Sequence, residues 1–169
     1  MKALLVLLLF AVTACSSTGG TMDKEVGRET LLKRPTLEAA AAVLMQLRDG
    51  IRDRISADLG LDQWSDQDDT TEAGCSEFPG LGAGTAFPSS LLLTAGVPDE
   101  QWDAAVRLVT EVAGQQGFGA AETVVNRPRQ HEVVLRGDDG ALLRFSTREH
   151  ATLSLESGCH LPAAQHRSG

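Results

Sequence analysis

Hydrophobic residues recur at helical spacing across residues 36–59. Leucine, isoleucine and alanine at positions 37, 41, 44, 47, 51 and 55 fall on one face of a helix. Thr36 precedes this pattern as a candidate N-cap, and Gly60 follows it as a candidate left-handed C-cap. The opposite face carries Arg48, Asp49 and further charged residues, which we interpret as a solvated surface. The pattern therefore predicts one long amphipathic helix.

A second helical pattern covers about residues 98–117. Asp99 and Glu100 lie in its expected first turn, where the helix dipole favours negative charge. Trp102 begins an apolar stripe that continues through positions 105, 106, 109, 112 and 113. Gly117 is suited to end this helix. The sequence thus predicts two helices, each with one buried face.

From about residue 121 the period of the pattern changes from 3.6 residues to 2. Alternation predicts four short strands at residues 123–126, 132–136, 142–147 and 152–157. Asp-Asp-Gly at 138–140 is a hairpin signal between the second and the third strand. Since Leu143 and Phe145 alternate with Arg144 and Ser146, one face of the sheet should be buried and the other solvated.

Residues 62–88 are rich in loop-forming residues, and further short strands are expected near 63–65 and 90–93. The economical arrangement of these elements is an α+β fold, with two helices packed on one face of a small antiparallel sheet. We expect a single domain over residues 35–162, followed by a disordered tail at 163–169.

The N-terminal residues resemble a bacterial lipoprotein signal. Lys2 is followed by an apolar run over residues 3–12, two small residues, and then Cys15. The run has only about half of the ~20 residues that a membrane-spanning helix needs. We therefore predict a signal peptide at 1–14, a diacylglycerol on the Cys15 thiol, and a flexible tether over 15–34.

The two other cysteines form an even pair once Cys15 carries lipid. Exported proteins meet an oxidising environment, so Cys75 and Cys159 are expected to form one disulfide. Cys159 has the same parity as Leu153 and Leu155, which predicts a core-facing position at the end of the sheet. Two free buried thiols are the alternative.

The acidic balance of the chain excludes some partners. The net charge is −8, and removal of Lys2 with the signal makes the mature chain one unit more negative. An acidic domain is a poor match for nucleic acid or for electrostatic attachment to anionic lipid. Membrane affinity must then come from the lipid on Cys15, where two or more acyl chains give stable attachment.

Motifs for metal, phosphate or catalysis are weak. The acidic segment from Asp66 to Glu77 partly matches a calcium loop, but its sixth position is Thr71 where glycine is required. Whether it binds a cation stays open, and an acidic solvated loop is the favoured interpretation. The glycines at 80, 82 and 84 lack the lysine of a phosphate loop. We therefore predict no metal and no cofactor.

Two histidines are the best candidates for a catalytic base. His131 and His150 could be brought close by the predicted strands, although no histidines have metal-ligand spacing. There is no Gly-x-Ser-x-Gly nucleophile elbow. The residues thus favour a protein that is not an enzyme.

Several short segments together resemble the LppA-type lipoproteins of mycobacteria and related actinobacteria. They are Pro-Thr-Leu-Glu-Ala at 35–39, Pro-Asp-Glu-Gln-Trp at 98–102, Gly-Phe at 117–118, Asn-Arg-Pro at 126–128 with His-Glu-Val at 131–133, and Gly-Cys-His-Leu-Pro at 158–162. The resemblance covers most of the mature domain. It implies a signal peptide, a lipidated cysteine and a membrane-associated domain, and it implies no particular reaction.

Two functions follow as hypotheses. The first is a binding or scaffolding module, anchored through Cys15 on the outer face of the cytoplasmic membrane, that contacts an envelope protein or a small hydrophobic ligand. The alternative is an envelope hydrolase whose site forms only in the fold, around His131 or His150. A pocket that gathers a histidine, a carboxylate and a nucleophile would favour the hydrolase.

Overall fold

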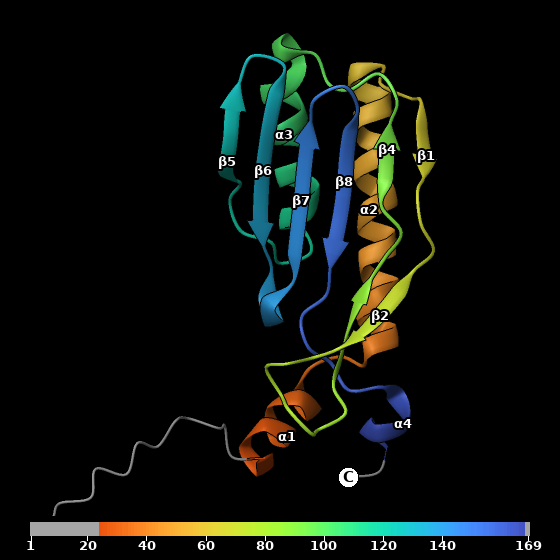
Figure 1. Cartoon of the computed structure of the whole chain (residues 1–169), viewed down its shortest axis with the longest axis vertical. Helices are drawn as coiled ribbons and strands as arrows, with labels where there is room; N and C mark the ends of the chain where they lie inside the picture. Colours follow the sequence, from red (N-terminus) through yellow and green to blue (C-terminus); the bar gives the residue numbers. More distant parts are fainter. Residues whose placement is uncertain (1–23, 168–169) are drawn as a thin grey trace, which may run out of the picture.

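The computed structural model describes residues 24–167 (Figure 1). The expected signal peptide, Cys15 and the first part of the expected tether lie outside the described residues. The elements are α1 (Lys24–Lys33), α2 (Leu37–Leu59), β1 (Trp64–Asp66), β2 (Thr71–Gly74), β3 (Gly84–Phe87), β4 (Leu91–Leu93), α3 (Asp99–Gly114), β5 (Glu122–Arg127), β6 (Gln130–Arg136), the 3₁₀ turn η1 (Asp138–Gly140), β7 (Leu142–Thr147), β8 (Ala151–Glu156) and α4 (Ala163–His166). None of the described helices is both long enough and apolar enough to span a bilayer.

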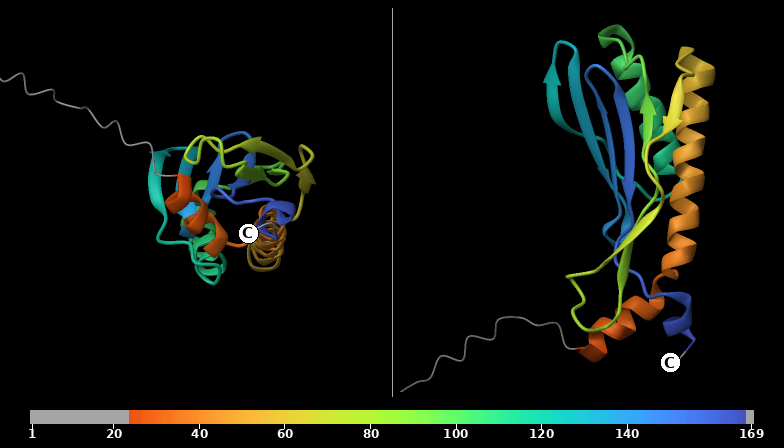
Figure 2. Two further views of the ribbon diagram at one scale, coloured as in Figure 1. Left: turned by 90° about the horizontal axis from the view of Figure 1, so that it is seen from below. Right: turned by 45° about the vertical axis from the view of Figure 1, so that its right-hand side comes forward.

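The long helices α2 and α3 begin and end close to where their sequence signals lie. The Thr36 hydroxyl accepts a hydrogen bond from the backbone of Ala39 at 3.2 Å, so it caps α2 as expected. Gly60 ends α2 in the left-handed conformation, at φ 68°. Helix α3 ends at Gly114, and Gly117 takes a left-handed φ of 81° in the turn that follows. Both helices lie against the same face of the main sheet (Figures 1 and 2).

The main sheet has six antiparallel strands in the order β1-β4-β8-β7-β6-β5. Strands β5 to β8 form the predicted meander, and β4 joins it by pairing with β8. The fold class is therefore α+β with two helices on one face of an antiparallel sheet, as predicted. Within residues 24–167, no helix covers the other face of this sheet (Figure 2).

A smaller layer lies beyond one end of the main sheet, where α1, α4 and the two-stranded β2-β3 sheet come together (Figure 1). The expectation of a flexible tether over residues 15–34 is wrong for its last part, because α1 is helical and Leu31 is fully buried. The expected disordered tail is likewise wrong at its start, where α4 forms. Short helices without a long amphipathic pattern gain stability mainly from tertiary packing, which a periodicity search does not detect.

Two separate hydrophobic clusters correspond to these two parts of the fold. The main core lies between the sheet and the helices α2 and α3, and includes Ile51, Trp102, Leu135 and Phe145. The second cluster holds α1 in place and consists of Leu31, Phe78, Ala83, Cys159 and Leu161. Cys75 and Cys159 form the predicted disulfide, and Cys159 is buried as its strand parity suggested.

Arg48 differs from its expected position on a solvated surface. Its side chain is only 5 % exposed, because β1 and the segment before β4 cover this part of α2. The guanidinium donates hydrogen bonds to Asp66 at 2.7 Å, to Asp49 at 2.8 Å and to the Ser89 carbonyl at 3.0 Å, and it also contacts the Ser89 hydroxyl. A buried arginine needs such partners for its donors. Asp66, from the acidic segment, is therefore part of a structural ion pair.

Candidate binding site on the open face of the sheet

The uncovered face of the sheet holds a hollow of about 440 Å³. Its floor is one row of side chains that lie directly opposite one another on five adjacent strands. In strand order across the sheet they are Val125, Glu132, Ser146, Thr152 and Leu92. Because neighbouring strands are about 4.8 Å apart, this row extends over about 19 Å. We call this feature the distal hollow.

The centre of the floor is made by two small hydroxyl side chains. The oxygens of Ser146 and Thr152 are 2.7 Å apart and share one hydrogen bond. Each hydroxyl keeps further hydrogen-bonding capacity, because a hydroxyl has one donor and two acceptor positions. Glu132 pairs with Arg144, which lies one row further along the same face. The floor is therefore polar at its centre, with one apolar side chain at each end.

The rim of the hollow comes from the β5-β6 and β7-β8 turns. His131 is buried, and its ring stacks on Trp102 at a centroid distance of 5.1 Å. Its Nδ1 is 2.8 Å from the Asn126 side-chain oxygen, and its Nε2 is 3.0 Å from an Asp99 carboxylate oxygen. These contacts join the β5-β6 hairpin to the start of α3. The pKa of Asp99 is lowered, mainly by the hydrogen bond with His131. The hydrogen bond that the backbone N–H of Arg129 donates to this carboxylate lowers the pKa of Asp99 further.

His150 lies at the tip of the other turn and is exposed. Its Nδ1 is 2.7 Å from the Thr94 carbonyl oxygen, so Nδ1 carries the proton in this contact. A hydrolase with a serine, threonine or cysteine nucleophile needs that hydroxyl or thiol within hydrogen-bond reach of its catalytic histidine. Within residues 24–167, no histidine nitrogen is hydrogen-bonded to a hydroxyl or thiol. The contacts of His131 and His150 are those of residues that fix the two turns.

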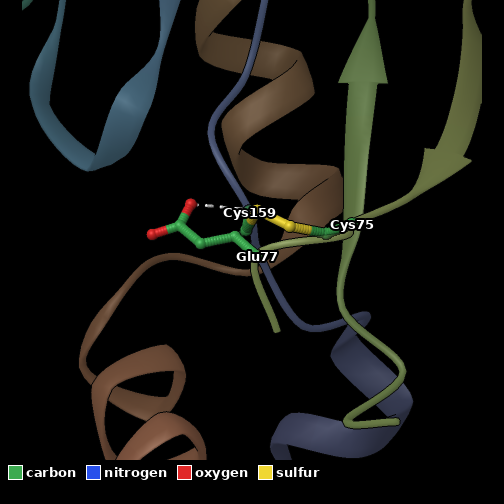
Figure 3. Close-up of side chains that lie close together, drawn as sticks. All are labelled: Cys75, Glu77 and Cys159. Atoms are coloured by element: carbon green, nitrogen blue, oxygen red, sulfur yellow. Dashed lines mark hydrogen bonds between the residues drawn. A yellow bond between two sulfur atoms is a disulfide. The ribbon is translucent and has the colours of Figure 1, made fainter. Parts of the chain in front are cut away.

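The disulfide lies at the other end of the fold, beside a carboxylate (Figure 3). The Glu77 carboxylate oxygen is 3.6 Å from the Cys159 sulfur, and the Cys75 sulfur completes the group. Among the described residues this is the only gathering of three metal-ligand side chains, and its two sulfurs are bonded to each other. The acidic residues at 66, 68 and 69 do not converge with Glu77, because β2 separates them along an extended path.

A smaller hollow of about 140 Å³ lies between α2 and the segments that follow α3 and β8. Val43, Leu44 and Phe118 supply apolar walls, and the buried His160 borders it. Burial lowers the pKa of His160, and its Nδ1 is 3.0 Å from the Pro35 carbonyl oxygen. A cavity of about 150 Å³ accepts a molecule the size of benzene, so this one suits a small apolar group and not a lipid chain.

Comparison with known proteins identifies the family of this chain. The model of the LppA family, described as a lipoprotein confined to pathogenic Mycobacterium, matches residues 17–163. The chain belongs to the LppA family. The resemblance seen in its short sequence motifs is thereby confirmed. A search of curated proteins finds no match.

Two solved structures share the fold of this LppA-family chain. LppA from Mycobacterium tuberculosis has a TM-score of 0.67 at 18% sequence identity, over 83% of this chain and 87% of that one. A DUF4853 family protein from Actinomyces odontolyticus has a TM-score of 0.55 at 17% identity, over 78% and 71% of the two chains. At such low identity these likenesses establish the fold alone. Nothing in their descriptions specifies a reaction or a ligand.

The site residues were only partly accessible from the sequence of this LppA-family member. Alternation along the strands assigned Arg144 and Ser146 to the solvated face, and this assignment is confirmed. The alternation did not reveal which solvated positions line up across the sheet, since register depends on pairing between strands. Arg129 and Arg148, on the two turns, carried no motif that could have selected them.

Proposed function

We propose that this LppA-family protein is a lipid-anchored binding module on the outer face of the cytoplasmic membrane, and that its ligand occupies the distal hollow. The observation that carries the proposal is the position of the hollow. At about 440 Å³ it is larger than the hollow beside α2, and it lies on the sheet face that no helix within residues 24–167 covers. Its polar floor suits a ligand that forms hydrogen bonds.

The separation between α1 and the hollow supports this arrangement. Helix α2 starts next to α1 and runs toward the turns that form the rim (Figure 1). Its 23 residues are about 35 Å long at 1.5 Å per residue. Eight residues lie between Cys15 and Lys24, and a fully extended chain covers these nine steps in at most about 30 Å. Lipid on Cys15 would hold α1 near the bilayer and leave the hollow accessible.

The anchor is tested with the Cys15→Ser variant of the full-length chain in an actinobacterial host. We expect the wild-type protein in the membrane fraction and the variant in the soluble fraction after signal processing. A processed variant that still partitions into the detergent phase would contradict the proposed anchoring, because one thiol is the only proposed attachment point.

Ligand binding is tested by native mass spectrometry of full-length protein extracted from membranes. We expect a co-purified ligand mass on the wild type and its loss from Ser146→Trp, which fills the centre of the hollow. The control is Ser154→Trp, two residues along β8 from the floor residue Thr152 on the same face but outside this hollow. Equal ligand occupancy in both variants, or a wild type without ligand, would overturn the proposal.

A further inference from the structure

Two arginine side chains lie on the neighbouring turns at the rim of the distal hollow. Arg129 belongs to the β5-β6 turn and Arg148 to the β7-β8 turn, and both line a polar recess of about 330 Å³. The recess adjoins the hollow, because Gln130, Arg148 and Glu149 line both. Both arginines are exposed to solvent. The two guanidinium groups therefore border one continuous space.

Neither of these guanidinium groups has an ion-pair partner among the described residues. Within residues 24–167, no ion pair and no side-chain hydrogen bond involves the side chain of Arg129 or Arg148. Most other arginines of this acidic chain do have a carboxylate partner. They are Arg34, Arg48, Arg52, Arg54, Arg136 and Arg144. Two unpaired cations on one recess are thus a local departure from a chain of net charge −8.

The backbone of Arg129 is held in a conformation that its side chain disfavours. Arg129 has φ 60°, and it follows Pro128 at a turn position where glycine is preferred. The Asp99 carboxylate accepts a hydrogen bond from the backbone N–H of Arg129 at 2.8 Å, and the same carboxylate contacts His131. Strained backbone supported by its surroundings is often found at ligand sites. A residue with a long cationic side chain is thus kept where glycine would be less strained.

We propose that Arg129 and Arg148 bind an anionic oxygen group of the ligand in the distal hollow, and this inference rests on the proposed function. Guanidinium groups match carboxylate and phosphate oxygens with paired hydrogen bonds. Glu149 lies on the same recess, and the Asp99 carboxylate also interacts electrostatically with Arg129. Because these two carboxylates offset the arginine charge, the recess suits a group with one negative charge, a carboxylate or a phosphate diester, better than a dianion.

The experiment follows the side-chain N–H signals of arginine by NMR in detergent-solubilised full-length protein. The probes are acetate for the carboxylate and dimethyl phosphate for the diester, each compared with sodium chloride at equal ionic strength. We expect saturable shifts at Arg129 and Arg148 with at least one probe, and the probe that binds more tightly identifies the source. Shifts no larger than those in sodium chloride with both probes would overturn the inference.

Two variants separate binding from folding. Arg129→Gly should weaken binding of the tighter probe about tenfold, which is the loss expected for one charged hydrogen-bonding partner. The melting temperature of this variant should be equal to that of the wild type or higher. Arg148→Gln should weaken binding by a similar factor. Arg107→Gln, an exposed arginine of α3 outside both spaces, is the matched control and should bind as the wild type does. Wild-type affinity in both arginine-site variants would overturn the inference.

Failure of this inference is distinguishable from failure of the proposed function. If the double variant Arg129→Gly with Arg148→Gln keeps the co-purified ligand while Ser146→Trp loses it, the hollow is the site and the ligand is not held by these arginines. If the double variant and Ser146→Trp both keep it, both proposals are wrong. Loss of the ligand from both variants supports both.

Discussion

Replacing Cys75 and Cys159 together by alanine should lower the free energy of unfolding by about 4.5 kcal/mol. The disulfide closes a loop with a sequence separation of 84 residues. In the chain-entropy model, a cross-link of that span removes about 15 cal/mol/K of entropy from the unfolded chain, which gives this value at 25 °C. For a domain of this size, the corresponding decrease in melting temperature is about 10–15 °C.

The location of the disulfide determines where the loss should be seen first. Cys159 belongs to the second hydrophobic cluster, which holds α1 against the loop between β2 and β3 and lies outside the main core. Without the cross-link, this cluster retains only a few buried side chains. Amide hydrogens of α1 and β2 should therefore exchange faster in the double variant, while those of α3 and β7 change less.

The assay combines chemical denaturation with hydrogen exchange. Wild-type protein treated with a reductant should match the double variant, and Ser76→Ala, next to Cys75 but without a thiol, should match untreated wild type. The reasoning is refuted if the double variant and the oxidised wild type have the same denaturation midpoint. The expectation that the loss begins at α1 is refuted if the amide hydrogens of α1 exchange as slowly as in the wild type while those of α3 exchange faster.

Three further changes test other parts of the fold. Leu31→Ala should cost about 2–4 kcal/mol by emptying a fully buried position on α1, measured by denaturant titration. Val26→Ala, on the same helix but 54% exposed, should cost far less. Arg48→Ala should cost about 2–3 kcal/mol because buried acceptors lose their donor, and Arg48→Met should recover part of this loss through packing. Because burial lowers the pKa of His160, the unfolded chain takes up the proton first, so stability is complete above about pH 6.5 and falls as the pH decreases below it. His160→Gln should flatten this dependence in melting curves recorded between pH 7 and pH 5, and an equal slope in both proteins would contradict the assignment.

The arrangement of the molecule separates its two ends. One end contains α1, the disulfide and the second cluster, and it is the end from which the chain leads back to Cys15. The other end contains the two turns, the distal hollow and the unpaired arginines. Mutations in α1, the disulfide or the second cluster should therefore affect stability. Mutations at Arg129, Arg148 or Ser146 should affect the proposed ligand binding with little effect on stability.

The sequence by itself was sufficient for the elements that rest on local signals. The helix from Leu37 to Leu59 could be predicted with both of its caps, because its apolar period, Thr36 and Gly60 all act within a few residues. The meander and its buried face followed from alternation. The disulfide followed from the number of cysteines and their expected environment, which also requires no knowledge of distant contacts.

Tertiary structure alone decided the burial of Arg48, the helix α1 and the site. Arg48 lies on the polar side of its own helix, and it is buried only because residues 66 and 89 fold over it. Helix α1 gains its stability from the second cluster, whose members come from three segments that are distant in sequence, at residues 31, 78–83 and 159–161. The floor of the hollow is one row across five strands, and Arg129 and Arg148 line one recess only because the two turns are neighbours in the fold. Strand register and side-chain burial depend on contacts between residues far apart in the chain, and no local pattern encodes those contacts.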